Sequence, residues 1–472
     1  MNLNKKDNMR SIKILIFFTL LYNFSIGQDR IYTLDVSPNS SVLNSFSISN
    51  TSSEEIGVLL ETRNNFEFYY YDSNLKEKFK IEFTPNNNSL KNYIGYSIES
   101  GMVHIIFANN SLSKFAKVTC DLKDGKIKSD KLDFQLKEEK LIEFFNYKDK
   151  LHIITSKPFN KHFYIYDFQN LKFNKHEISI NSTDGQNDYL QPANNLLKDN
   201  SFSAIGENLT CFSENNIYSF DQTALKAKVY TLSESIVITF DKENHLTRVI
   251  SIDPESFLSE SKVYFHDETR NTIKNSNSYI YDNKLFQISS ANDFLKLNIY
   301  DLKTSTLIKS YLANDISEIY FKNGIIKQSK TDLLGGNKEL EKSKQFLRKI
   351  SKGIQGVSIL KHKANYKVSI GSVKNVTFSG GNGFSFDPIN QNFISSFPFK
   401  SDPDLKMVWI DCIFNENFDH ISGSIEEYFP KTLLNAEKNN FVDKRSLFIY
   451  RDKEYRGVYI PSLKKYRISR LN

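Results

Sequence analysis

The chain has 472 residues, a formal net charge of +7 at pH 7 and 14% aromatic residues. Lysine alternates with aspartate and glutamate instead of clustering, which argues against a basic nucleic-acid-binding surface. The three cysteines (Cys120, Cys211 and Cys412) and the scattered histidines show no zinc-ligand spacing. A chain of this length can bury a substantial core without disulfides, so cysteine pairing stays open.

The first 27 residues have the pattern of a secretory signal peptide. Four basic residues precede a short apolar segment, residues 14–21, and small residues stand before a cleavage point at Gln28. The apolar segment is about half as long as the roughly 20 residues of a membrane span. We therefore expect residues 28–472 to be exported to a periplasm, the cell surface or the exterior, with no transmembrane segment after cleavage. An uncleaved N-terminal anchor is the alternative.

Short runs of β-branched and aromatic residues recur along the chain, separated by polar turns. In the clearest copies, 57–72, 151–167 and 285–301, an apolar run and a turn precede a second run that ends in aspartate. These and weaker copies place aspartates at Asp72, Asp121, Asp167, Asp221, Asp267 and Asp301, which lie 34 to 54 residues apart. We interpret the aspartates as turn formers. A period in the forties with about four strands is typical of propeller blades.

The repeat resembles the β-propeller superfamily, and the composition resembles exported proteins of AT-rich Bacteroidota-type bacteria. The resemblance implies an all-β fold of four-stranded antiparallel blades, seven being favoured over six or eight, in a single domain over residues 28–472. Blades are expected at 90–135, 138–181 and 275–313, and residues 31–36 are expected to close the ring against 466–469. A pair of β-sandwich domains is the competing fold, but such domains rarely repeat one four-strand pattern.

Two stretches depart from the strand pattern. Residues 337–352 predict a helix capped by Asn337, with an apolar stripe of Leu340, Phe346, Leu347 and Ile350 packed on a blade. Residues 430–438 predict a second, shorter helix that starts at Pro430. Because insertions between propeller strands often form the ligand face, the less regular stretch 330–445 is the first place to look for function.

Motifs for catalysis are absent from the sequence. It has no serine-nucleophile elbow and no phosphate loop, and its single tryptophan, Trp409, disfavours quinone-dependent propeller enzymes. His104 and His152 lie within apolar runs and are interpreted as core residues. Acidic residues at Asp402, Asp404, Asp411, Glu426 and Glu427 are interpreted as turn residues in preference to a catalytic or calcium-binding group. We expect no cofactor and no metal.

If the ring forms, the turns between second and third strands share one face with the links between blades. That face would carry seven polar residues, which are Arg63, Asn64, Asn109, Lys157, Asn160, His162 and Asn292. Such a surface suits a polar or anionic partner, either a glycan or a protein. The sequence therefore favours a non-catalytic binding or scaffold module. Whether the chain is an enzyme stays open. The alternatives are a glycan hydrolase or lyase with carboxylates from different blades, and a subunit of an envelope assembly.

Overall fold

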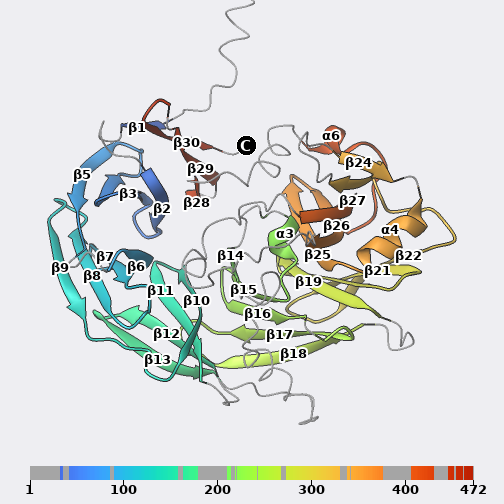
Figure 1. Cartoon of the computed structure of the whole chain (residues 1–472), viewed down its shortest axis with the longest axis horizontal. Helices are drawn as coiled ribbons and strands as arrows, with labels where there is room; N and C mark the ends of the chain where they lie inside the picture. The colour runs from blue at the N-terminus through green and yellow to red at the C-terminus, as the bar shows by residue number, and fades with distance from the viewer. Residues whose placement is uncertain are drawn as a thin grey trace, which may run out of the picture.

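The computed structural model describes residues 32–35, 42–85, 90–157, 163–178, 210–213, 218, 220–241, 243–266, 273–329, 337–340, 342–375, 405–429, 445–450, 453–460 and 462–470. Their strands form seven separate sheets. The sheets follow one another in chain order around a ring (Figure 1), and we number them as blades 1 to 7. The predicted all-β propeller is confirmed, with seven blades.

Blades 1, 2, 3 and 5 are four-stranded antiparallel meanders. Blade 1 contains β2 (Val42–Asn50), β3 (Glu55–Thr62), β4 (Phe66–Tyr71) and β5 (Glu77–Phe83). Blade 2 contains β6 (Asn92–Glu99), β7 (Met102–Ala108), β8 (Phe115–Asp121) and β9 (Ile127–Leu132). Blade 3 contains β10 (Lys140–Tyr147), β11 (Lys150–Ser156), β12 (Phe163–Gln169) and β13 (Lys172–Ile178). Blade 5 contains β19 (Asn275–Tyr281), β20 (Lys284–Ser290), β21 (Phe294–Asp301) and β22 (Leu307–Asn314).

Blades 4 and 6 each have a fifth strand. Blade 4 contains β14 (Thr210–Ser213), which pairs in parallel with β15 (Ala227–Thr231), and then β16 (Ile236–Phe240), β17 (Leu246–Ile252) and β18 (Ser259–Phe265). Helix α3 (Phe220–Thr223) lies between β14 and β15 in the chain. Blade 6 has the order β24 (Asn337–Leu340), β23 (Ile326–Ser329), β27 (Leu405–Phe414), β26 (Asn365–Asn375) and β25 (Ile354–His362). Helices α4 (Ser343–Ile350) and α6 (Ile425–Tyr428) accompany it.

Blade 7 joins the two ends of the chain. It contains β28 (Arg445–Tyr450), β29 (Lys453–Ile460), β30 (Lys465–Arg470) and, as its outer strand, β1 (Tyr32–Asp35). Strand β1 runs antiparallel to β30, with Tyr32 opposite Ile468 and Leu34 opposite Tyr466. The closure expected from residues 31–36 and 466–469 is therefore confirmed. It removes an unpaired sheet edge at each end of the chain.

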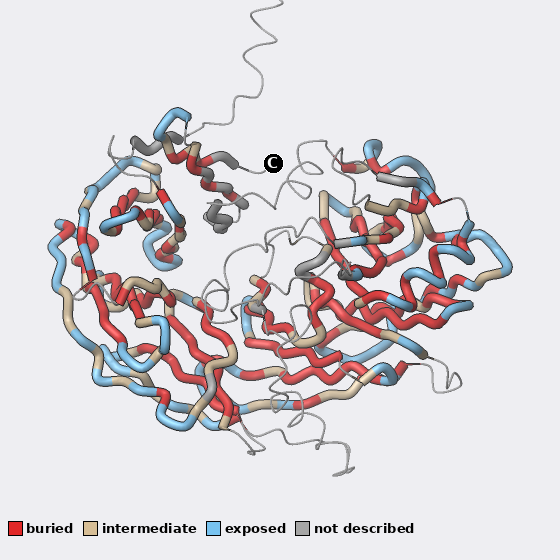
Figure 2. Tube along the Cα trace, in the orientation of Figure 1, coloured by how far each residue is buried: buried red, intermediate tan, exposed pale blue. Residues whose placement is uncertain are grey.

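Burial explains why the repeat reads as apolar runs followed by a polar run. Strands inside a blade are covered on both faces by neighbouring blades, and β4 and β16 are buried at every position. Outermost strands have one covered face, so β5 and β22 expose most of their residues. Figure 2 shows this gradient from buried inner strands to exposed outer strands. Apolar clusters between adjacent blades provide most of the core.

The turn-forming role of the aspartates is confirmed in three of the predicted repeats. Asp72 directly follows the third strand of its blade, and Asp121 and Asp301 are the last residues of theirs. Each accepts hydrogen bonds from backbone N–H groups two to four residues onward. The assignment is wrong for Asp167, which lies within β12, and for Asp221, which lies in α3. Asp267 is outside the described residues. In blade 4 the equivalent residue is Asp253, which accepts hydrogen bonds from the amides of Glu255 and Ser256.

The helix predicted over 337–352 is correct only in its second half. Residues 337–340 form β24, whose backbone pairs with β23, and this pairing outweighs the helical pattern of the side chains. Helix α4 therefore starts at Ser343, after Lys342, and Asn337 does not cap it. Its stripe of Phe346, Leu347 and Ile350 is fully buried against blade 6, as expected. The helix predicted over 430–438 lies outside the described residues, and α6 ends before it.

Candidate functional site

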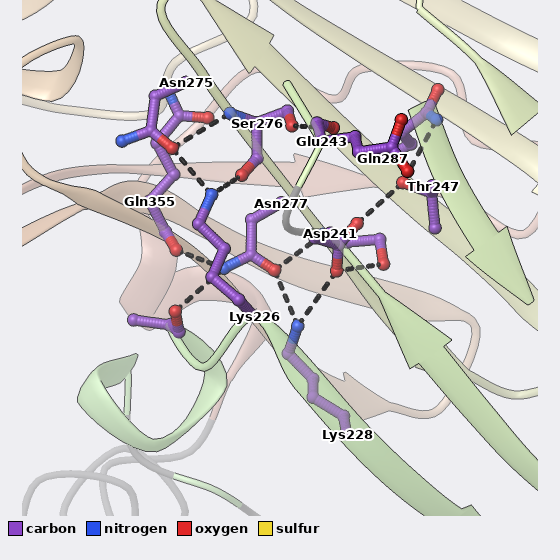
Figure 3. Close-up of polar contacts among 12 residues, drawn as sticks. Lys226, Lys228, Asp241, Glu243, Thr247, Asn275, Ser276, Asn277, Gln287 and Gln355 are labelled. Carbon is purple, nitrogen blue, oxygen red and sulfur yellow. Dashed lines mark hydrogen bonds and ion pairs between the residues drawn. The ribbon is translucent and has the colours of Figure 1, made fainter. Parts of the chain in front are cut away.

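A network of buried polar side chains joins blades 4, 5 and 6 (Figure 3). Blade 4 contributes Lys226 and Lys228 around the start of β15, Asp241 after β16, and Thr247 on β17. Blade 5 contributes residues 275–278 at the start of β19 and Gln287 on β20, and blade 6 contributes Gln355 on β25. Strands of three neighbouring blades therefore bring charged and amide groups together in the interior.

An ion pair forms the centre of this network. Lys228 Nζ lies 3.2 Å from Asp241 Oδ2, and both side chains are 0% exposed. Lys228 also donates a hydrogen bond of 2.6 Å to Asn277 Oδ1. The Asp241 carboxylate accepts hydrogen bonds from the hydroxyls of Thr247 (2.6 Å) and Ser278 (2.8 Å). Buried charges are stable only when paired and hydrogen-bonded in this way.

Asn277 links the ion pair to all three blades. Its side-chain amide donates to the backbone carbonyl of Ala224, at 3.0 Å, and to the carbonyl of Gln355. Asn275, two residues earlier on β19, makes an equivalent contact with blade 6. Its side-chain amide donates a hydrogen bond to the backbone carbonyl of Gly353. The two asparagines thus fasten the inner strand of blade 5 to the start of the inner strand of blade 6.

Lys226 is the group in this network with the most unusual electrostatics. Its Nζ donates to Asn275 Oδ1, at 2.7 Å, and to the Ser276 carbonyl. Burial lowers the pKa of Lys226 to about 8, against partial compensation by Asp241. Burial also lowers the pKa of Lys228. An amine with a lowered pKa can act as a base or a nucleophile. The Lys226 amine, however, is already hydrogen-bonded to Asn275 and Ser276 inside the protein.

Some polar atoms in this region have no protein partner within the described part of the chain. They are Gln287 Oε1, Gln355 Oε1 and His266 Nε2. Burial lowers the pKa of His266 to about 4, so its imidazole is neutral at pH 7. Buried acceptors of this kind are where ordered water is usually held.

His104 and His152 are core residues, as the sequence indicated. Both side chains are buried, and burial lowers the pKa of His152 to about 4. The ring of His152 stacks on Phe145 at 5.4 Å. On the outside of the same blade, His176 Nε2 lies 2.6 Å from Asp167 Oδ1, and Phe257 of blade 4 stacks on the His176 ring at 3.7 Å. This contact holds blades 3 and 4 together.

The predicted binding residues are distributed over separate turns. Arg63 and Asn64 are exposed between β3 and β4, and Lys157 is half-buried after β11. Asn109 bonds within its own turn, to the amides of Ser113 and Lys114. Asn292 accepts a hydrogen bond from Ser351 at 2.9 Å. Asn160 and His162 lie outside the described residues, so the grouping of all seven stays a prediction.

Sequence reasoning did not identify the interior network. Lys228 and Asp241 meet across the β15–β16 hairpin of blade 4, and Asn277 joins them only because the ring brings blades 4 and 5 together. The available signal was a lysine within the apolar run 227–231 and the polar run 275–278 at the start of a strand. Among the described residues, no group of three or more His, Cys, Asp or Glu side chains is placed to hold a metal ion. All three cysteines are free.

No protein-family model and no curated protein matches the chain. Solved structures that resemble it include the Dos1 propeller, which is 12% identical, with 92% of this chain and 78% of that chain covered and a TM-score of 0.31. Another is Hsv2 of Kluyvelomyces marxianus, at 8% identity, 92% and 98% coverage and a TM-score of 0.29. The dihydro-heme d1 dehydrogenase NirN matches at 12% identity and a TM-score of 0.29, and the match spans half of its chain.

Likenesses this distant carry no argument about function. The class of the protein follows from its own sheet topology, which is that of a seven-bladed β-propeller. No helix in the described part of the chain is both long and apolar enough to span a membrane.

Proposed function

We propose that this propeller is an exported, non-catalytic binding or scaffold module. The observation that supports this proposal is the network around Lys228 and Asp241. Its charged groups, which would be the reactive ones in an enzyme, are fully buried and hydrogen-bonded to residues from three blades. Such an arrangement fixes the blades relative to one another, which suits a rigid platform that presents a surface to a partner.

Export is supported by the N-terminal pattern and by the composition of the chain. The full-length chain, produced in a bacterium with a secretion system, is expected to appear outside the cytoplasm. Its N-terminal peptide, identified by mass spectrometry, is expected to begin at Gln28. A product that retains residues 1–27 and stays in the membrane fraction would support the uncleaved anchor.

A substrate panel tests the absence of catalysis. Mature protein is incubated with glycoside, ester and phosphomonoester substrates, next to Lys226→Met and Asp167→Asn variants. We expect no turnover above that of heat-denatured protein. Turnover that one of these variants abolishes, while its melting temperature stays within a few degrees of the wild type, would overturn the proposal and favour an enzyme.

One further observation favours a role as an assembly subunit. Of the twelve large apolar side chains that are exposed in the described residues, six lie within 307–325, namely Leu307, Ile308, Leu312, Ile316, Tyr320 and Ile325. Ile316 is 91% exposed. Apolar side chains concentrated in this way often mark a protein interface. If they do here, the mass of the wild-type protein in light scattering should increase with its concentration, and Ile316→Lys should reduce that increase. A monomer mass at every concentration in both proteins would contradict this role.

A further inference from the structure

Exposed apolar side chains of this protein are concentrated in the segment that follows β22. Ile316 is 91% exposed, Tyr320 62% and Ile325 46%. Ile319 and Phe321, which lie between them in the sequence, are buried in the core cluster that blades 5 and 6 share. The segment is therefore anchored in the core and presents its other apolar side chains on the surface.

The start of this segment is fixed by a turn. We call residues 315–325 the rim segment. The side-chain oxygen of Asn314, at the end of β22, accepts hydrogen bonds of 3.1 Å from the backbone amides of Ile316 and Ser317. It also accepts a hydrogen bond of 3.0 Å from the Ser317 hydroxyl. Asparagine bonded to the backbone two residues on is a regular turn structure, so Ile316 projects from a defined turn.

Helix α4 lies next to β22 at the outer rim of the ring (Figure 1) and adjoins the rim segment. Lys344 Nζ of α4 lies 3.2 Å from Asp315 Oδ2 at the start of the rim segment. Lys349 donates a hydrogen bond to Gln328, just beyond its end. Phe346 of α4 enters the same core cluster as the buried residues of the rim segment. The helix and the rim segment therefore form one continuous surface.

The outward side of α4 is basic. Its exposed basic residues and those of its flanks include Lys342, Lys344, Arg348 and Lys352, and the helix itself contains no acidic residue. Lys344 and Arg348 are four residues apart, so they lie on the same side of the helix, and Lys352 follows in the turn after it. The buried stripe of α4 occupies the opposite side. Long basic side chains thus stand next to the exposed apolar side chains of the rim segment.

The formal charge of this region is positive whichever of its own side chains pair with one another. Residues 315–352 contain nine basic and five acidic residues, a net charge of +4 in a chain whose total is +7. Outside the stretch, Asp411 of β27 neutralises one of these charges, because it lies 2.7 Å from Lys327. A surface with this excess attracts an anionic partner and repels a cationic one.

From this geometry we infer that α4 and the rim segment bind the surface of an anionic lipid bilayer, with Ile316 inserted among the lipids and Arg348 and Lys352 at headgroup phosphates. The inference rests on the proposed binding role and names its partner. Apolar side chains that project beside exposed lysine and arginine bind anionic membranes through both apolar burial and charge attraction.

A second copy of this chain is the competing occupant of the surface. In a two-fold dimer the same patch lies on both sides of the interface, so the positive charges of the two α4 helices would face one another. Lipid phosphates carry the opposite charge. The bilayer therefore complements the surface better than another copy does.

Co-sedimentation with vesicles tests the inference. The mature protein is mixed with unilamellar vesicles of equal parts phosphatidylglycerol and phosphatidylcholine, and the bound fraction is measured at increasing lipid concentration. We expect saturable binding that weakens as salt is added, and binding to pure phosphatidylcholine vesicles that is at least about tenfold weaker.

Two variants test the two parts of the surface. Arg348→Gln combined with Lys352→Gln should weaken binding to the anionic vesicles by about 25-fold, which corresponds to about 1 kcal/mol for each basic residue near an anionic membrane. Ile316→Asn should weaken it by about tenfold, the lower end of what burial of an isoleucine contributes.

Each variant has a matched control. Lys123→Gln combined with Lys126→Gln removes two exposed lysines from the turn after β8 in blade 2. Leu258→Asn removes an apolar side chain that is 75% exposed between β17 and β18. Both controls should bind like the wild type. The inference is overturned if anionic vesicles do not bind, if neutral vesicles bind equally well, or if either test variant binds like the wild type.

The same protein samples separate this inference from the proposed function. If anionic vesicles do not bind but the mass in light scattering rises with protein concentration, the lipid inference is overturned and the assembly role stands. Turnover in the substrate panel would contradict the non-catalytic role even if the vesicles bound as expected.

Discussion

Replacement of Lys228 tests whether the interior network holds the blades. Lys228→Met keeps most of the apolar stem but leaves Asp241 buried with only hydroxyl partners, since Thr247 and Ser278 are its other donors. Removal of one partner from a buried ion pair costs about 3–5 kcal/mol. At about 2.1 cal/mol/K of unfolding entropy per residue, a mature chain of this length should lose about 3–5 °C in melting temperature.

The assay is differential scanning calorimetry at pH 7, and a second variant isolates the charge. Lys228→Met with Asp241→Asn removes both charges together, and it should recover part of the lost stability because no unpaired ion remains buried. Lys303→Met is the control, because Lys303 and its partner Glu234 are both largely exposed. An exposed pair contributes about 0–1 kcal/mol. If Lys228→Met melted within about 1 °C of the wild type, the reasoning would be refuted.

Three further predictions concern pH and ring closure. The free energy of unfolding should fall as the pH drops from 6.5 towards 4. Burial lowers the pKa of folded His152 to about 4, so over this range the unfolded residue gains a proton that the folded one does not bind. Calorimetry of His152→Phe should show a shallower fall. The free energy of unfolding of the wild type should rise relative to that of Lys226→Met from about pH 8 to about pH 10. Over this range the folded lysine has lost its proton while the unfolded one still binds it. Equal slopes of unfolding free energy against pH in the two proteins would contradict this. Deletion of residues 28–36 removes β1, so hydrogen exchange should accelerate within β30 but not within β20, and unchanged protection of β30 would argue against the closure.

The repeating part of the fold could be predicted because each blade carries its own local signals. A turn-forming aspartate such as Asp301 ends a mostly buried strand and precedes an exposed one, and both features are visible in the sequence. Blade 4 carries weaker signals of this kind. Its strands β15 and β16 are short and almost fully buried, and hence have no alternation that marks their ends. The equivalent turn at Asp253 therefore escaped notice.

The interior network and the ion pairs of Asp411 with Lys327 and Lys367 in blade 6 could not be predicted in the same way. Lys228 meets Asn277 across a blade boundary, and Lys327 meets Asp411 across a sheet whose strand order differs from the chain order. Strand register determines both meetings, and in blade 6 the paired strands β23 and β27 are far apart in the sequence. Asp411 was recognised as one of several acidic residues, but its lysine partners were not.

The pairing of β1 with β30 has a practical consequence. Since Tyr32 lies opposite Ile468, the two ends of the described chain are adjacent at the rim of one blade. Adjacent termini are the condition under which circular permutation succeeds. A permutant with a short linker between residues 470 and 32, reopened in the turn between β9 and β10, would have blade 7 as a continuous four-stranded unit. The seam of the ring would then lie between whole blades instead of within one.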